Sequence, residues 1–261
     1  MNIPPAAAIA LVLSLLAFAG VQRSLRGRPM TTRLAWFFPL MVLALPGALF
    51  GLYYRHVLPE WEGFYTLRSW PGSELLMVFV GAAGGALAAM LSRVLAVFPF
   101  LLAAALGAAP LVKSFVDPLA QGDIKNRWEG EVCLQSTGST CGPASVCTML
   151  KHFGITVTEG DVARAAYTTM SGTEAWYLAR FVRRQGLMPR FCFRDTFSPE
   201  AGLPAMVGVH QGSTGHFIVV LEQTGSQLTI ADPMRGEEHL SMAEFQHRYQ
   251  FTGFHMVISR Q

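Results

Sequence analysis

The sequence predicts two parts of different fold class, an all-α transmembrane region of four helices followed by an α+β domain. The chain has 261 residues, of which 51% are hydrophobic and only 14% are charged, whereas soluble domains carry about 25% charged residues. The charge is also uneven, with 10 charged residues in positions 1–112 and 27 in positions 113–261. This composition predicts that the first part is a membrane region and that the second is an ordinary water-soluble domain.

Four uncharged stretches make up the first part: Met1–Gln22, Leu34–Tyr54, Leu75–Ser92 and Val94–Val112. About 20 apolar residues in a helix cross the hydrocarbon core of a bilayer. We therefore expect membrane spans near residues 3–22, 34–54, 75–92 and 94–112. Gly81 and Gly85 form a GxxxG pattern, which is either a face for close helix packing or a chance pair of small residues.

Basic residues predict the orientation of these spans. The connection after the first span carries four arginines, Arg23, Arg26, Arg28 and Arg33, which places it in the cytoplasm. Four crossings then put everything after Val112 on the periplasmic or extracellular side of a bacterial inner membrane. The segment Ala17-Phe18-Ala19 resembles a signal-peptidase site, but no basic residue precedes the apolar run, and we interpret the first span as uncleaved.

The second part begins with a polar linker, residues 113–130, followed by a domain over residues 131–261. An apolar stripe with helical spacing predicts a helix at 142–152, and further helices are expected at 160–166, 172–185 and 242–249. Alternating or continuous apolar runs predict strands at 188–193, 205–210, 217–222, 227–231 and 254–259. Gly154 and Gly186 follow two of the helices, as expected for helix ends. Helices first and strands later indicate an α+β domain.

Several classes of function are excluded by missing motifs. The sequence contains no Gly-Lys pair and therefore no Walker A loop, and it has no H-E-x-x-H, Cys-x-x-Cys or G-x-S-x-G motif. The four cysteines lack the spacing of zinc ligands. A net charge of +3 gives no basis for nucleic-acid binding. We expect neither a cofactor nor a metal ion.

Cys141 is the candidate nucleophile. It precedes Gly142, Pro143 and an apolar helical stripe, and proline early in a helix marks a helix start. The positive end of the helix dipole favours the nucleophilic thiolate. The alternative is that Cys141 and the small residues after it only start the helix and have no catalytic role. Cys147 lies mid-helix and is expected in the core, whereas Cys133 and Cys192 show no chemistry beyond a disulfide if the domain lies outside the cytoplasm.

His216 and Asp232 are the candidate base and its orienting partner. They lie on two strands joined by a glycine-containing turn, and a three-residue loop, Gln223–Gly225, would place them directly opposite each other. Opposed side chains have Cβ atoms about 5 Å apart, which an imidazole and a carboxylate can bridge. Asn2 and Asn126, the chain's two asparagines, lie too far upstream to take the third position.

At these residues the sequence resembles the C39 peptidase family, papain-like peptidases that cleave double-glycine leaders. The resemblance runs from about Glu131 to Ile258 and rests on four segments: Gln135–Gly142, Leu203-Pro204, Gly215–Val220 and Ala231–Pro233. It implies a papain-like fold, with Cys141 as nucleophile, His216 as general base and acid, and Asp232 orienting His216. It also implies that Gln135 donates its amide to an oxyanion hole.

The sequence departs from that family in two respects. Many members carry an acidic residue where this chain has Thr140. Transporter relatives place the peptidase before their membrane helices and add an ATPase, whereas here four expected spans come first.

We therefore expect a membrane-anchored cysteine peptidase that acts on a peptide or protein precursor, with a Gly-Gly leader as one candidate substrate. Its expected partners are that precursor, the lipid bilayer and export or secretion machinery, and no nucleic acid. Two alternatives stay open, a non-catalytic C39-like peptide-binding module that serves an export machine and a thiol acyltransferase that uses the same site.

Overall fold

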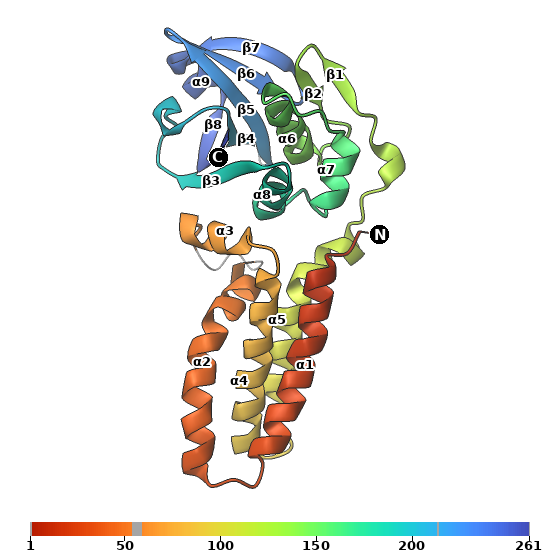
Figure 1. The fold of residues 1–261 in the computed structure, drawn as a ribbon, viewed down its shortest axis with the longest axis vertical. Helices are drawn as coiled ribbons and strands as arrows, with labels where there is room; N and C mark the ends of the chain where they lie inside the picture. Colours follow the sequence, from red (N-terminus) through yellow and green to blue (C-terminus); the bar gives the residue numbers. More distant parts are fainter. Residues whose placement is uncertain (1, 54–58, 213, 261) are drawn as a thin grey trace. The chain divides into compact units, whose positions relative to one another are not determined.

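The computed structural model describes residues 2–53, 59–212 and 214–260, and it divides into two compact units (Figure 1). The helical unit comprises residues 3–59 and 71–116. The α+β unit comprises residues 1–2, 60–70 and 117–261. A short segment between the second and third apolar helices therefore belongs to the α+β unit.

The helical unit contains four helices long and apolar enough to cross a membrane. They are α1 (Pro5–Leu25), α2 (Met30–Tyr53), α4 (Met77–Met90) extended by the 3-10 turn η1 (Ser73–Leu76), and α5 (Val97–Val116). The predicted all-α region of four helices is confirmed. Helix α2 begins four residues before the predicted span, the predicted end at Tyr54 lies outside the described residues, and α5 continues past Val112.

Glycines on α4 allow α1 to approach closely. A Cβ atom built on Gly81 would overlap the Ser14 carbonyl oxygen, and one built on Gly85 would overlap the Phe18 carbonyl oxygen. Only a residue without a side chain fits where two helix backbones come this near. The GxxxG pattern is therefore a face for close helix packing and not a chance pair of small residues.

The α+β unit is built on a six-stranded antiparallel sheet in the order β3-β8-β4-β5-β6-β7. The strands are β3 (Leu187–Phe193), β4 (Ala205–Gln211), β5 (Thr214–Thr224), β6 (Gln227–Asp232), β7 (Gly236–Ser241) and β8 (Gln250–Arg260). The helices are α6 (Cys141–His152), α7 (Glu159–Ala165), α8 (Ala175–Arg184) and α9 (Met242–Arg248). Strands β1 (Arg127–Glu129) and β2 (Val132–Leu134) pair separately.

The predicted α+β fold class is confirmed, and the predicted helices and strands appear with small shifts of their ends. Strand β7 and the pair β1-β2 were not expected. Helix α6 packs against β5, and α8 packs against β3. On β5 and β6 the alternating residues Ile218, Val220, Leu228 and Ile230 join one buried core, as their spacing predicts, together with Phe245 of α9.

Helix α3 (Glu62–Arg68) is the short helix between the second and third apolar helices, and it packs into the α+β unit. Tyr65 is buried among aromatic rings of β3, α8 and β8, with ring centroids at 5.0 Å from Phe193, 5.5 Å from Trp176 and 5.6 Å from Phe254. The Arg194 guanidinium lies 2.8 Å from the Glu62 carboxylate. No pattern in the sequence of this connection between two spans predicts this packing.

The hairpin β5-β6 has a different register from the predicted one. Its turn is two residues long, Gly225-Ser226, because Thr224 pairs with Gln227. Gly225 takes a φ of +62° there, which favours glycine. The ladder then shifts between Val220 and Glu222, where Leu221 forms a β-bulge. The three-residue loop and the direct pairing of His216 with Asp232 were therefore wrong.

The bulge decides on which face of the sheet Asp232 points. Without the bulge, the pairing that begins at the turn would continue along both strands and set Asp232 opposite Val219. The side chains of Val219 and His216 point to opposite faces of the sheet, so Asp232 would then lie on the wrong face. The extra residue shifts the ladder by one, so that Val219 pairs with Ala231 instead and Asp232 falls next to Ile218. Asp232 and His216 then share a face as diagonal neighbours, within reach of their side chains.

Candidate active site

Cys141 begins helix α6, which lies close against the sheet. A Cβ atom on Gly142 would lie 2.9 Å from Leu178 Cδ1 and 3.5 Å from Phe217 Cδ2, so glycine permits the close approach of this first turn. Ser145 Oγ donates a hydrogen bond to the Phe217 carbonyl at 3.2 Å. This bond joins the helix that carries Cys141 to the strand that carries His216.

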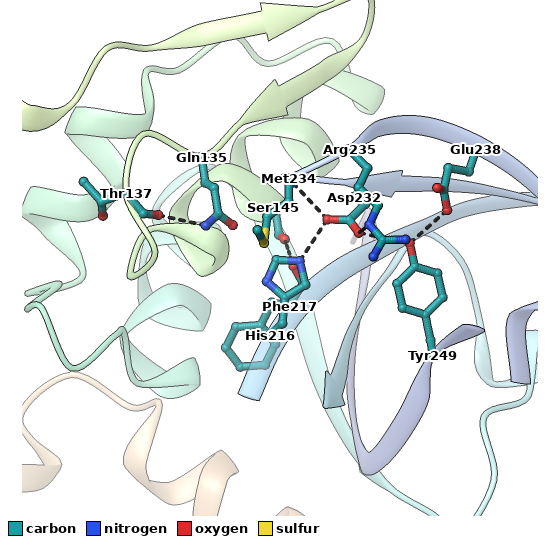
Figure 2. A network of polar contacts seen from close by, with 10 residues as sticks. All are labelled: Gln135, Thr137, Ser145, His216, Phe217, Asp232, Met234, Arg235, Glu238 and Tyr249. Atoms are coloured by element: carbon teal, nitrogen blue, oxygen red, sulfur yellow. Dashed lines mark hydrogen bonds and ion pairs between the residues drawn. The ribbon is translucent and has the colours of Figure 1, made fainter. Parts of the chain in front are cut away.

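His216 and Asp232 form a buried pair, shown in Figure 2. The distance from His216 Nε2 to Asp232 Oδ1 is 2.9 Å, and the side chains are only 5% and 1% exposed. Since Asp232 takes Nε2, the nitrogen that remains for the Cys141 thiol is Nδ1. The structure thus brings together the three residues that the sequence named as nucleophile, base and orienting carboxylate.

Asp232 is held by further donors around its carboxylate. Oδ1 also accepts the Met234 N–H at 2.9 Å, Oδ2 accepts the Tyr249 hydroxyl at 3.0 Å, and Arg235 Nε lies 3.8 Å from Oδ2 (Figure 2). Burial raises the pKa of Asp232, but the hydrogen bonds from His216, Met234 and Tyr249 outweigh it and hold the pKa below its ordinary value. The carboxylate is therefore ionised and fixed in orientation.

The electrostatic surroundings of His216 favour its protonated form. Burial lowers the pKa of the imidazole, but hydrogen bonds to Asp232 and Cys141, with the charges of both groups, raise it to about 9. A pKa of about 9 favours the imidazolium form of the ring at neutral pH, beside the Asp232 carboxylate. This arrangement can stabilise a thiolate and can deliver a proton to a leaving group.

Gln135 precedes the loop that leads into α6. Its backbone N–H donates to the Pro233 carbonyl at 2.9 Å, which ties it to the residue after Asp232. Its side-chain Nε2 donates to the Thr137 carbonyl at 2.8 Å (Figure 2). An amide NH2 group has two hydrogens, so one of them remains for a substrate oxyanion. Gln135 Oε1 is buried and has no hydrogen-bond partner within the described part of the chain.

The remaining cysteines take no part in this arrangement. All four cysteines are free thiols, so no disulfide joins Cys133 to Cys192. Cys147 is fully buried, and a hydrogen bond with Cys133, together with burial, raises the pKa of its thiol well above the ordinary value. Across residues 2–53, 59–212 and 214–260, no three His, Cys, Asp or Glu side chains gather in a metal-binding arrangement.

One feature of the site was missed in the sequence. Tyr249 reaches Asp232 from the end of α9, and its hydroxyl also lies 2.9 Å from Glu238 Oε2. No local pattern marks this tyrosine, because its partner is fixed only by the packing of α9 on the sheet. Outside the site, His255 of β8 is fully buried.

The second part of the chain is similar to known proteins. Residues 130–261 match the model of the peptidase C39 family. An uncharacterized protein of Methanothermobacter marburgensis is 31% identical over 140 residues, which cover 53% of this chain and 96% of that protein. The lactococcin-G-processing and transport ATP-binding protein LagD of Lactococcus lactis subsp. lactis is 26% identical over 119 residues, 44% of this chain and 17% of that protein.

Among solved structures, the peptidase domain of Streptococcus ComA, a bifunctional ABC transporter involved in a quorum-sensing pathway, aligns with a TM-score of 0.45 and 24% identity. The alignment covers 50% of this chain and 98% of that domain. The family match itself spans half of the chain and contains Gln135, Cys141, His216 and Asp232. The chain belongs to the peptidase C39 family.

Proposed function

We propose that this chain is a membrane-anchored cysteine peptidase that cleaves a peptide bond in a peptide or protein precursor. The observation that carries the proposal is the buried His216, bonded to Asp232 at 2.9 Å through Nε2, with its pKa raised to about 9 by Asp232 and Cys141. A nucleophile, a base and an orienting group in this relation are what thiol catalysis needs.

The reaction begins when the Cys141 thiolate attacks the carbonyl carbon of the scissile bond. The carbonyl oxygen takes the negative charge and is stabilised by the Cys141 N–H and the Gln135 amide. The His216 imidazolium then donates its proton to the leaving amine as the C–N bond breaks, which leaves a thioester on Cys141. Neutral His216 next takes a proton from water, the hydroxide attacks the thioester, and the acid product and thiolate are released.

Asp232 keeps His216 in one orientation during both proton transfers. Its three hydrogen bonds, to His216, Met234 and Tyr249, leave the carboxylate no freedom to turn away. The negative charge also stabilises the imidazolium that exists before the first proton transfer. Asp232 is therefore an orienting and electrostatic group, with no proton of its own to give.

The four apolar helices would anchor this site at a membrane. The four arginines after α1 favour a cytoplasmic first connection. Helix α3, between the second and third apolar helices, packs within the α+β unit, which requires that both lie on the same side of the bilayer. Two spans separate them in the sequence, in agreement with a four-span count. We propose that the peptidase domain lies on the outer side, next to a precursor delivered by export machinery.

The proposal is tested with the full-length chain in detergent micelles and a synthetic precursor that carries a Gly-Gly leader. Mass spectrometry should find one new C-terminus and one new N-terminus per cleaved bond with the wild type and neither with Cys141→Ala. Cys192→Ala, which removes a buried thiol on β3, is the matched control and should cleave as the wild type does. Equal cleavage by Cys141→Ala and wild type would refute a cysteine peptidase.

A second measurement addresses the peptide-binding alternative. A catalytic Cys141 is alkylated by iodoacetamide rapidly near neutral pH, and the rate should fall in His216→Gln. Slow alkylation that does not depend on His216 would instead favour a binding module. Fusion of a reporter after Val116 tests the side of the membrane, and a cytoplasmic signal would contradict the proposed orientation.

A further inference from the structure

A buried carboxylate lies behind the loop that follows Gln135. Glu159, the first residue of α7, has no solvent-exposed surface. Its Oε1 accepts the backbone N–H of Ser136 at 2.8 Å, and its Oε2 accepts the Ser136 hydroxyl at 2.5 Å. Since Ser136 directly follows Gln135, this carboxylate holds the backbone immediately beside the candidate oxyanion-hole amide.

Neither an ion pair nor helix capping explains why the carboxyl group of Glu159 is buried. A buried carboxylate without a cation is costly, and in the described part of the chain Glu159 meets no Lys, Arg or His within ion-pair distance. It does not cap the helix, because the Thr158 side chain takes that role by accepting the Asp161 N–H at 3.0 Å. Its hydrogen bonds go to Ser136.

The loop held by Glu159 is closed on itself by Thr140. The backbone N–H groups of Ser136 and Thr137 both donate to Thr140 Oγ1, at 3.1 Å and 3.0 Å. The hydroxyl of Thr140 in turn donates to the Thr137 carbonyl at 3.1 Å, the same carbonyl that receives the Gln135 amide. The loop is thus a compact turn, anchored on one side by the Pro233 carbonyl and on the other by Glu159.

We propose that Glu159 is a positioning residue for oxyanion stabilisation, which holds Ser136 so that the Gln135 amide and the Cys141 N–H face one point. The inference rests on the proposed function, because it concerns the same acyl-transfer step. Donors stabilise a developing oxyanion only when they are held at hydrogen-bond distance from its final position, and small misplacements are expensive. A buried, bidentate carboxylate fixes a backbone segment in the way this requires.

The test compares two reactions of Cys141 in the full-length chain. Acylation by p-nitrophenyl acetate forms an oxyanion, whereas alkylation by iodoacetamide forms none. Glu159→Ala should slow the p-nitrophenolate burst about 10- to 100-fold, with alkylation within about twofold of wild type. Asp161→Ala, two residues along the same helix, removes an exposed carboxylate that contacts Thr158 and Arg164 and should leave both reactions unchanged.

Further variants separate positioning from a general structural role. Glu159→Gln keeps one oxygen acceptor and should recover part of the lost acylation rate. Gln135→Ala should slow acylation at least as much as Glu159→Ala, and the double variant should be no slower than Gln135→Ala alone, because both changes remove one interaction. The inference would be overturned if the double variant slowed acylation by the product of the two single effects. It would also be overturned if Glu159→Ala slowed alkylation as much as acylation.

Failure of the inference and failure of the proposed function give different results. A wild-type chain that is acylated normally, with Glu159→Ala acylated at the same rate, would overturn the inference alone. A wild-type chain whose Cys141 is alkylated but never acylated would overturn the proposed function, and the inference with it. Cys141→Ala supplies the background rate in both measurements.

Discussion

Replacement of Asp232 by asparagine isolates the effect of its charge on His216. The geometry can be retained, because Oδ1 of the amide can still accept from His216 Nε2 and the Met234 N–H. The new NH2 group then faces the Tyr249 hydroxyl, which can accept that hydrogen and donate its own to Glu238. What the variant loses is the carboxylate charge.

The magnitude follows from the pKa of His216. It is raised from the ordinary value of 6.5 to about 9 despite burial, a change worth about 3 kcal/mol between the two protonation states. The hydrogen bond and charge of Asp232 supply a large part of the increase. Asp232→Asn removes the charge and leaves a neutral acceptor, and we therefore expect the pKa of His216 to fall by at least about one unit, together with a loss of activity of at least about 100-fold.

The same shift predicts how stability depends on pH. A histidine whose pKa is raised in the folded state stabilises that state fully below its unfolded pKa, near 6.5, and the contribution disappears as the pH rises through about 9. Asp232→Asn should therefore be less stable than wild type at pH 6, by up to about 3 kcal/mol, and should approach the wild type at pH 9.5.

Two measurements check this prediction. NMR titration of isotopically labelled histidine, with His216→Gln to assign the resonance, gives the pKa of His216 in both chains. Denaturant unfolding, followed by fluorescence of Trp128 and Trp176, gives the stability at each pH. A pKa that stays near 9 in Asp232→Asn, or a stability difference that does not shrink between pH 6 and pH 9.5, would refute the reasoning.

Three further substitutions test other parts of the structure. Gly142→Ala places a Cβ 2.9 Å from Leu178 Cδ1 and should slow acylation of the nucleophile by about 10-fold or more in burst kinetics; an unchanged rate contradicts the close packing. His255→Leu removes two buried ring nitrogens that lack partners among the described residues, and whose burial lowers the histidine pKa to about 4. It should stabilise the unit by about 1 kcal/mol at pH 7, and by more as the pH falls from 6.5 toward 4, in denaturant unfolding. Tyr65→Ala should destabilise the unit by about 3 kcal/mol, whereas exposed Thr66→Ala should change stability by under about 0.5 kcal/mol; equal effects would contradict the docking of α3.

Membrane spans and helix starts could be read from the sequence because both are local properties. An apolar run of about 20 residues is independent of distant parts of the chain. The sequence Cys141-Gly142-Pro143 marks the start of α6 in the same way, since proline at the first turn is a local conformational preference. The order of Gln135, Cys141, His216 and Asp232 was also sufficient to identify the family, which the match over residues 130–261 confirms.

The register of the β5-β6 hairpin could not be read in this way. Turn lengths of two and three residues both fit a sequence with Gly225, and a bulge has no sequence pattern of its own. In the structure the shorter turn and the bulge at Leu221 together set Asp232 on the face of His216. The prediction of a contacting pair held although its geometric reason was wrong.

The sequence alone determined what each segment is, an apolar span, a helix with a cysteine at its start, or a strand with a histidine. Only the tertiary structure decided which segments meet. Helix α3 joined the α+β unit, Tyr249 reached Asp232, and Glu159 came to lie behind Gln135. The physical reason is that helix and strand patterns arise from neighbouring residues, whereas these contacts join residues many positions apart and form only when the packed core brings their elements together.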